Sequence, residues 1–308
     1  MLKKLKKKAY GLFHLDNRIN SLERRLKVIN DTEKVLLAKL VISDLHKKGK
    51  LNNIGEAEFS AFSEGGDDGI IQYLVAHTQC EARFVDLGGG NYQSPDTRLL
   101  LQHNLWDGLI VDATPVSEFE KEEFTKFYNI RRKQAFITVD NVNELIEQEK
   151  IGHLNIDIDG NDYWILKAIK NRPSIVCVEY NSFFGLHPIT IPYQSNFRRT
   201  ECDYGTIYHG ASLIAICDLM KERGYIFVGT TRFVSNAYFV LKEKADLNYI
   251  KEVTPEEYWN QLPCTEHRDK KGKIYRIDPK EAIDYFLKEA PFVNTKNGKT
   301  IKGKDVFN

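Results

Sequence analysis

Residues 84–101 read FVDLGGGNYQSPDTRLLL, which combines a short apolar strand, three consecutive glycines and the start of an amphipathic helix. Glycines let the backbone turn sharply after a strand and approach a ligand closely, because no Cβ stands in the way. Such a turn at the carboxyl end of a strand is typical of the ligand crevice in an open α/β sheet. We therefore predict that Gly88, Gly89, Gly90 and the strand-end acid Asp86 bind a nucleotide-type cofactor.

The spacing of these glycines argues against a dinucleotide. The dinucleotide fingerprint G-x-G-x-x-G directs a pyrophosphate onto the helix N-terminus. Here the third glycine comes early, and Tyr92, Gln93 and Pro95 crowd the start of the helix. An acidic strand end before a glycine turn suits a cationic ligand that carries an amine, and S-adenosylmethionine is the common cofactor of this kind.

Strand and helix patterns alternate along the middle of the chain. Beyond the first strand, we predict strands at 109–112, 135–140, 154–159, 175–179, 225–228 and 237–241. We predict helices at 96–104, 116–128, 142–149, 162–170 and 211–223. This alternation predicts a doubly wound α/β fold with a mostly parallel sheet, and the short connection 229–236 predicts a closing hairpin. Seven strands closed by a hairpin are the arrangement of class I methyltransferases.

The next two strands of this pattern also end in an acid. Asp112 follows the second strand, a little over twenty residues after the glycine turn, where a carboxylate accepts hydrogen bonds from both ribose hydroxyls. Asp140 ends the predicted third strand, where a side chain accepts a hydrogen bond from an adenine amino group. Both acids are therefore predicted to bind the cofactor.

Several segments resemble FkbM-type S-adenosylmethionine-dependent methyltransferases, a family often found with bacterial surface-polysaccharide genes. The similarity covers residues 58–242 and is carried by SEGGDDGIIQYL (63–74), FVDLGGGN, GLIVDATP, LNIDIDGNDYWILKAI (154–169), IVCVEYN, YHGASL and NAYFVL. The resemblance implies O-methylation of a sugar or sugar-derived group in capsule or lipopolysaccharide biosynthesis. It also implies that Glu64, Asp67 or Asp68 lies near the methionine end of the cofactor. This chain departs from the family at those positions, where Gln-x-x-Glu-Asp-Gly-Ile is common, and at Asp112, where Glu is common.

The composition agrees with a globular enzyme, and the resemblance implies a small-molecule or glycan substrate. With 42% hydrophobic and 28% charged residues the chain is ordinary, and a net charge of +1 implies no general attraction to nucleic acid. The five cysteines show no paired spacing, which favours a reduced, cytoplasmic location. We expect a helical N-terminal extension at 1–57, the methyltransferase domain at 58–243 and a C-terminal extension at 244–308.

The two ends of the chain differ from the middle. Residues 1–10 are strongly basic, and an a/d seam of about two heptads follows at Leu15, Ile19, Leu22, Leu26 and Ile29. This helix either packs on its own catalytic domain or forms a homodimer, and its lysines are able to contact a membrane surface weakly. At the other end we predict a helix at 279–289 and a polar tail with little to bury.

The predicted chemistry lies on the fourth and fifth strands. Asp157 and Asp159 share one face of LNIDIDG, and two carboxylates on a covered central strand are costly to bury without compensation. Glu179 ends the neighbouring strand and Asn181 follows it, with both side chains on the same side. Asp159, Glu179 and Asn181 would suit Mg²⁺ or another divalent cation. In the alternative interpretation, Asn181 caps its loop and Glu179 binds substrate hydroxyls without a metal.

A general base is the other route to activating a hydroxyl acceptor. His209 precedes a predicted helix in the segment YHGASL and is the best candidate base among the eight histidines. Asp157 is the next candidate base, and Tyr208 and Asn236 are candidate substrate contacts. Phosphate, phosphoramidate and amine acceptors stay open. So do two other classes of function, an NAD-dependent oxidoreductase and a non-catalytic binding protein.

Overall fold

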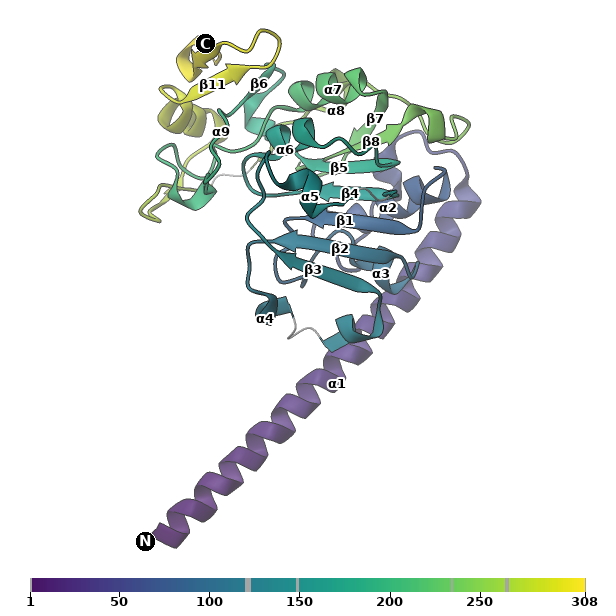
Figure 1. The fold of residues 1–308 in the computed structure, drawn as a ribbon, viewed down its shortest axis with the longest axis vertical. Coiled ribbons are helices and arrows are strands. Elements are labelled where there is room, and N and C mark those ends of the chain that lie inside the picture. Colours follow the sequence, from purple (N-terminus) through teal and green to yellow (C-terminus); the bar gives the residue numbers. More distant parts are fainter. Residues whose placement is uncertain (1, 120–122, 148–149, 234, 264–265, 308) are drawn as a thin grey trace.

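The structure, a computed structural model, describes residues 2–119, 123–147, 150–233, 235–263 and 266–307, without the side chains of residues 2–17, 20, 24, 118, 119, 123 and 124. A seven-stranded sheet forms its centre, in the order β3-β2-β1-β4-β5-β8-β7 (Figure 1). These strands are β1 Arg83–Leu87, β2 Asp107–Asp112, β3 Ile130–Gln134, β4 His153–Ile156, β5 Ile175–Glu179, β7 Tyr225–Thr230 and β8 Asn236–Leu241. The first five are parallel, whereas β8 is antiparallel to both β5 and β7. The predicted class I methyltransferase fold is confirmed.

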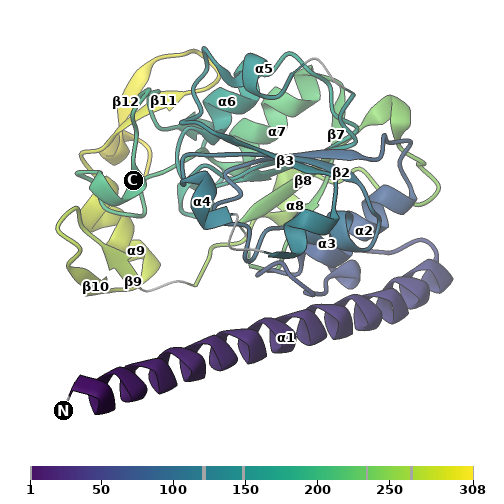
Figure 2. The same ribbon diagram turned by 60° about the horizontal axis from the view of Figure 1, so that its bottom comes forward.

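Helices cover both faces of this sheet, as a doubly wound fold requires (Figure 2). On one face lie α5 Val142–Leu145, α6 Asp162–Ala168 and α7 Leu213–Glu222, and on the other α2 Asp67–Ala76 and α3 Arg98–Gln102. Successive residues of β1 point to opposite faces of the sheet. Val85 and Leu87 belong to the hydrophobic core on one face, and Phe84 belongs to the core on the other face. Because both faces are buried, the carboxyl edge of the parallel strands is where a ligand can reach the sheet.

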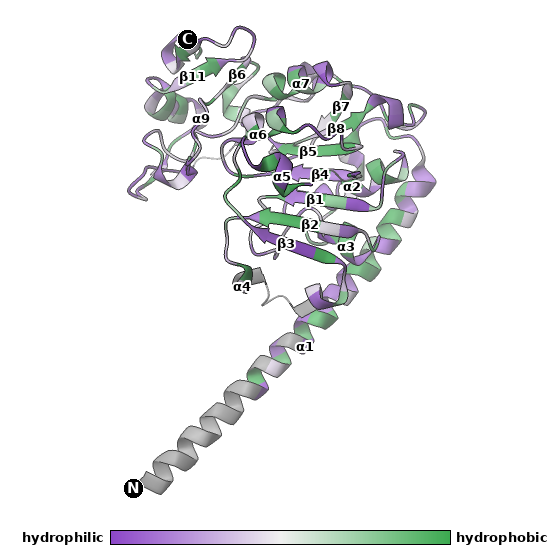
Figure 3. Cartoon of the chain, viewed as in Figure 1, coloured by the Kyte–Doolittle hydropathy of each residue, from purple (hydrophilic) through white to green (hydrophobic). Residues whose placement is uncertain are grey.

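The third strand lies earlier in the chain than predicted. The strand predicted at 135–140 is wrong, since β3 covers Ile130–Gln134 and pairs with β2 from Ile130↔Gly108 to Gln134↔Asp112. Its sequence, IRRKQ, is charged because β3 is an edge strand, which tolerates and uses charged side chains. Figure 3 shows this contrast between the hydrophilic β3 and the hydrophobic β2.

The N-terminal extension is a single helix, α1 Leu2–Lys48, that runs past the sheet domain (Figure 1). Its inner face packs on the domain through Ala38, Ile42 and Leu45, which are 2–6% exposed. The predicted seam behaves differently, because Ile19, Leu22, Leu26 and Ile29 are exposed. The side chain of Leu15 lies outside the described residues. No helix of the described residues is both long and apolar enough to span a membrane.

The C-terminal extension forms a small layer of its own. The predicted helix corresponds to α9 Pro279–Ala282, which continues into a π-helical turn at Ile283–Leu287. The prediction that the tail has little to bury is wrong. There, β11 Pro291–Asn294 pairs with β12 Thr300–Lys302 and with β6 Ile189–Thr190, a strand from within the methyltransferase region. Phe292 of β11 is fully buried, so this sheet has a hydrophobic core.

The remaining α-helices and strands of the described residues are short. They are α4 Val116–Phe119, α8 Pro255–Tyr258, and the hairpin strands β9 Glu266–Arg268 and β10 Ile274–Arg276. The helices predicted at 116–128 and 142–149 extend over residues 120–122 and 148–149, which lie outside the described residues.

Candidate active site

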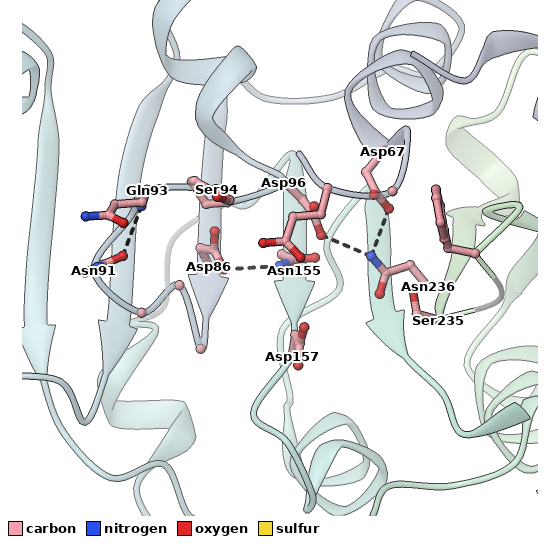
Figure 4. A pocket seen from close by; sticks show the side chains of 17 residues that line it. Asp67, Asp86, Asn91, Gln93, Ser94, Asp96, Asn155, Asp157, Ser235 and Asn236 are labelled. Carbon is pink, nitrogen blue, oxygen red and sulfur yellow. Dashed lines mark hydrogen bonds between the residues drawn. The ribbon is translucent and has the colours of Figure 1, made fainter. Parts of the chain in front are cut away.

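A cavity of about 500 Å³ opens beside the glycine turn, at the carboxyl ends of β1 and β4 (Figure 4). Five carboxylates line it, and no Lys, Arg or His side chain is among the described residues of its wall. The five acids are Glu64, Asp67, Asp86, Asp96 and Asp157. Such an excess of negative charge in a confined space favours a cationic ligand and disfavours a phosphate.

Asp86 is the best-anchored acid of this cavity. Its carboxylate accepts hydrogen bonds from Thr97 Oγ1 at 2.6 Å and from Asn155 Nδ2 at 3.2 Å. Burial raises the pKa of Asp86 to about 6, because desolvation outweighs the stabilisation of the charged form by these two donors. Asp86 therefore lies in the wall of the cavity beside the glycine turn, and a nearby positive charge would stabilise its carboxylate.

Two further acids share one donor on the opposite wall. The side-chain amide of Asn236 donates to Asp67 at 2.8 Å and to Asp96 at 3.1 Å (Figure 4). Tyr238 also donates its hydroxyl hydrogen to Asp67. The pKa of Asp96 is raised well above its usual range, first by burial and then by the negative charges of Asp67 and Asp86. Asn236, predicted to contact substrate, thus lies in the wall of this cavity, where its amide bridges Asp67 and Asp96.

The acidic segment before the first strand divides between two roles. Glu64 lines the cavity. Asp68, in contrast, accepts hydrogen bonds from the backbone N–H groups of Ala61, Phe62 and Ser63 at 2.7–2.9 Å and does not line the cavity. The position of Asp68 indicates that it shapes the loop that carries Glu64 to the site.

A second, smaller cavity of about 130 Å³ adjoins the first, since Gly88 and Asp157 line both. Gly88 has a φ of +99°, and a Cβ there would lie 1.6 Å from the carbonyl oxygen of Asp157, so only glycine fits. Asp112, Phe136 and Ile137 also line this cavity. Together the two cavities form a trough across the ends of β2, β1 and β4.

Asp112 and Asp140 lie in different surroundings. Asp112 accepts hydrogen bonds from the N–H groups of Gly90 at 3.0 Å and Thr114 at 2.6 Å, which orient its carboxylate at the second cavity. Asp140 is exposed in a turn and lines neither cavity, because the strand that was predicted to end there ends at Gln134. The prediction of Asp140 at a strand end is wrong, and the residues of that segment that line the second cavity are Phe136 and Ile137.

Beyond the trough, three carboxylates meet. Asp157, Asp159 and Glu179 each offer an oxygen within 4.8 Å of the others. Burial raises the pKa of Asp157 well above its usual range, and the negative charges of Glu179, Asp162 and Asp159 add to this shift. A nearby positive charge would lower this pKa again by stabilising the carboxylate.

A cationic side chain that the sequence analysis missed lies at this cluster. Arg199 Nη1 lies 2.6 Å from Asp159 Oδ1 and 3.7 Å from Glu179 Oε1. Burial alone would raise the pKa of Glu179, but His209 and Arg199 outweigh it and the pKa is lowered. Arg199 supplies the positive charge that a divalent cation was predicted to supply.

The side chain of Asn181 hydrogen-bonds to backbone groups and not to the three carboxylates. Its side-chain oxygen accepts the N–H of Phe183 at 3.0 Å, and its amide nitrogen donates to the carbonyl groups of Ile207 at 2.8 Å and His209 at 2.9 Å. This is the loop-capping role of the alternative interpretation. The predicted set of Asp159, Glu179 and Asn181 therefore does not fit a metal ion, and we derive no metal-dependent step.

His209 lies beside Glu179. The His209 Nδ1 atom is 3.4 Å from Glu179 Oε2, and the imidazole is 7% exposed. The neighbouring Tyr208 points elsewhere: its hydroxyl donates to the carbonyl group of Pro291, and its ring packs on Phe292 at 5.4 Å between centroids. Tyr208, predicted to contact substrate, is a core residue of the small C-terminal layer.

The turn that carries Asp159 depends on Asp162. Asp162 is fully buried and accepts the N–H groups of Ile158 at 2.8 Å and Gly160 at 2.9 Å. These bonds close the chain into a turn after β4, in which Asp159 has a φ of +58°. A non-glycine residue in this conformation is strained, and such strain is commonly found at functional sites.

No family model matches the sequence, and no curated protein matches it. Among solved structures, the chain is similar to an O-methyltransferase family protein from Burkholderia thailandensis, at 10% identity and a TM-score of 0.38, over 55% of this chain and 52% of that one. It is also similar to an S-adenosylmethionine-dependent methyltransferase from Clostridium acetobutylicum, at 14% identity and a TM-score of 0.33, over 51% of this chain and 82% of that one. A third similar structure is the N-terminal domain of EvdMO1 with SAH bound, at 10% identity and a TM-score of 0.39, over 58% of this chain and 79% of that one. The chain spans about half the length of the Burkholderia protein, and the fold assignment rests on the strand order itself.

Proposed function

We propose that this protein is an S-adenosylmethionine-dependent methyltransferase. The observation that carries the proposal is the acidic cavity beside the glycine turn, which has five carboxylates and no basic side chain among the described residues of its wall. S-adenosylmethionine carries an ammonium group and a sulfonium group against a single carboxylate, so its methionine end has a net positive charge that complements this cavity. Its adenosine end suits the smaller cavity, where Asp112 would accept the ribose hydroxyls and Phe136 and Ile137 would flank the base.

An NAD-dependent oxidoreductase fits the same trough less well. The two phosphates of a dinucleotide would lie against the glycine turn, where Asp86 and Asp157 face the cavity. Like charges in a confined space repel, and the basic side chain beside the turn, Arg132, does not line the cavity. It donates to the carbonyl oxygen of Gly90 and lies 3.8 Å from Asp112. The charge of the cavity therefore favours the methyl donor.

Catalysis is assigned to His209 with support from Glu179. When bound, S-adenosylmethionine supplies a methyl group on a positively charged sulfur, and the protein must position the acceptor and take its proton. Glu179 lies 3.4 Å from His209 Nδ1 and favours a proton on that nitrogen. Nε2 is then the ring nitrogen that accepts the proton of the acceptor hydroxyl. Arg199 balances the charge of Asp159 and Glu179 without a metal.

The acceptor is proposed to be a hydroxyl group of a sugar or sugar-derived compound in surface-polysaccharide biosynthesis. This finer assignment rests on the resemblance of residues 58–242 to FkbM-type methyltransferases. A phosphate, phosphoramidate or amine acceptor would require a different proton balance, because a phosphate anion has no proton for His209 to remove.

Ligand binding and product analysis test the proposal in two steps. S-adenosylmethionine at about 100 times its dissociation constant should stabilise the protein by about 2.7 kcal/mol, whereas NAD at the same concentration should not. Stabilisation by NAD alone would overturn the proposal. Incubation with nucleotide sugars and glycans should then yield a product heavier by one methyl group, and binding without transfer to any acceptor would favour a non-catalytic role.

A further inference from the structure

The helix α1 has two apolar faces, and only one of them is covered. Its inner face, formed by Val35, Ala38, Ile42 and Leu45, packs on the domain, with Phe62 and Leu99 among its neighbours. The other face carries six large apolar side chains that are 44–69% exposed. We call this face the outer seam; it consists of Ile19, Leu22, Leu26, Ile29, Leu36 and Leu40.

The outer seam follows a heptad repeat over about three heptads, one more than the segment that ends at Ile29. With Ile19 at position a, the a positions are Ile19, Leu26, Glu33 and Leu40, and the d positions are Leu22, Ile29 and Leu36. The inner-face residues fall at positions c and f, on the opposite side of the helix. The domain therefore does not block the a/d surface, and a partner helix has access to it.

Charged side chains beside the outer seam select the orientation of a partner. Position g carries Arg18, Arg25 and Lys39, while position e carries Glu23 and Asp44. In a parallel pair of helices, each g residue faces the e residue five positions later in the partner, so Arg18 faces Glu23 and Lys39 faces Asp44. In an antiparallel pair, g faces g and e faces e, which would bring like charges together.

We propose that α1 forms a parallel, in-register coiled coil with a second copy of this chain. The two catalytic domains would lie on opposite outer sides of the coiled coil, because each is attached to the c/f face of its own helix. Both basic N-terminal segments would then lie at the same end of the dimer. Glu33 is the one charged residue in the a/d stripe between Ile19 and Leu40, and it would face its own copy, which limits the stability of the dimer.

A matched pair of variants tests the seam. Ile29→Asp places a charge at position d, whereas Val28→Asp places the same charge at the adjacent position c. Both side chains are exposed, Val28 by 62% and Ile29 by 52%. We expect the full-length protein to sediment as a dimer. Ile29→Asp should weaken dimerisation by on the order of 10²-fold or more, since two apolar side chains are lost per dimer, and Val28→Asp should leave it unchanged. Equal behaviour of the two variants would overturn the proposal. Unchanged melting of the catalytic domain would show that the variants fold.

Cross-linking and charge exchange test the orientation. Leu22→Cys places two thiols opposite each other in a parallel dimer, so oxidation should yield a covalent dimer that the unsubstituted chain does not form. Arg18→Glu and Glu23→Arg should each weaken the homodimer, and mixing the two variants should restore a dimer that contains one of each. Restoration in the mixture, together with a stronger dimer in Glu33→Leu, supports the parallel arrangement. A protein that stays monomeric at all concentrations would overturn the proposal. So would a monomer whose outer seam binds anionic phosphatidylserine vesicles.

Discussion

Two acidic regions lie next to each other at the carboxyl edge of the sheet, and they differ in how their charge is balanced. The cavity beside the glycine turn has five carboxylates and no basic side chain among the described residues of its wall. The neighbouring cluster of Asp159 and Glu179 is in contact with Arg199 and His209. Asp157 lies between the two regions and belongs to both.

This difference indicates which region needs a ligand of opposite charge. Unbalanced carboxylates are costly to bury, and the raised pKa values of Asp86 and Asp96 reflect that cost. A cationic cofactor would relieve it. The second region already contains its own cation, Arg199, so it is suited to hold an uncharged acceptor and to move a proton. Changes in the first region should therefore affect cofactor affinity, and changes in the second should affect turnover.

The largest expected effect lies in the balanced region. His209→Ala should reduce turnover by about 10²- to 10⁴-fold, because no other group in that position takes the proton of the acceptor. The affinity for S-adenosylmethionine, measured by calorimetry, should stay nearly the same. His46→Ala, on the exposed part of α1, is the control and should change neither quantity. A variant of His209 that loses affinity but keeps turnover would reverse the roles of the two regions.

The next effect separates the two acids that were both predicted to bind the cofactor. Asp112→Ala should weaken S-adenosylmethionine binding by about 1–3 kcal/mol, since the ribose hydroxyls lose their acceptor. Asp140→Ala should have no effect, because Asp140 is exposed and lines neither cavity. Calorimetry of the two variants side by side provides the measurement. Equal losses, or no loss in Asp112→Ala, would contradict the assignment of the smaller cavity to the ribose.

A smaller effect should appear in the pH dependence of binding. The pKa of Asp86 in the free protein is raised to about 6, so its carboxylate is ionised above that pH and becomes protonated below it. A cationic ligand favours the ionised form, and the affinity should therefore fall by about tenfold for each pH unit below 6. Binding titrations between pH 5 and pH 8 measure this dependence.

Asp86→Asn provides the control for that titration. The variant should bind S-adenosylmethionine more weakly at pH 7.5 and should lose the pH dependence. Because the pKa of Asp86 is raised on folding, the ionised group destabilises the free protein, and this cost is fully present above pH 6. Asp86→Asn should accordingly raise the melting temperature of the free protein at pH 7.5. A pH dependence that persists in the variant would assign it to another acid of the cavity.

The main sheet could be predicted from the sequence because its central strands are apolar and its helices alternate with them. Strand β5 was predicted with its observed bounds, Ile175–Glu179. The edge strand β3 was missed, since its charged sequence IRRKQ lacks the apolar pattern on which the prediction relied. The small C-terminal sheet was missed for another reason, because β11 pairs with β6 about a hundred residues earlier in the chain.

The sequence predicted the site residues that lie at strand ends. It did not predict the residues whose place in the site depends on contacts between distant parts of the chain. Asp86, Asp112 and Glu179 each lie at the end of a strand, as their place in the sequence suggests. Arg199 lies in a short 3₁₀ turn forty residues after Asp159, and no local pattern links the two. The role of Asn181 depends on the carbonyl groups of Ile207 and His209, which only the folded chain brings to it.

The smallest expected effect is that of a chelator, and it tests whether the second region is balanced by its own side chains. Because Arg199 contacts Asp159 and Glu179, treatment with EDTA should leave turnover nearly unchanged, and added Mg²⁺ or Mn²⁺ should not raise it. Arg199→Gln removes the resident cation but leaves Asp157, Asp159 and Glu179 close enough to share an ion. This variant should gain stabilisation by Mn²⁺ in a thermal melt, while the unsubstituted protein should show none. Loss of activity with EDTA and its recovery with Mg²⁺ in the unsubstituted enzyme would show instead that a metal, and not Arg199, balances these carboxylates during turnover.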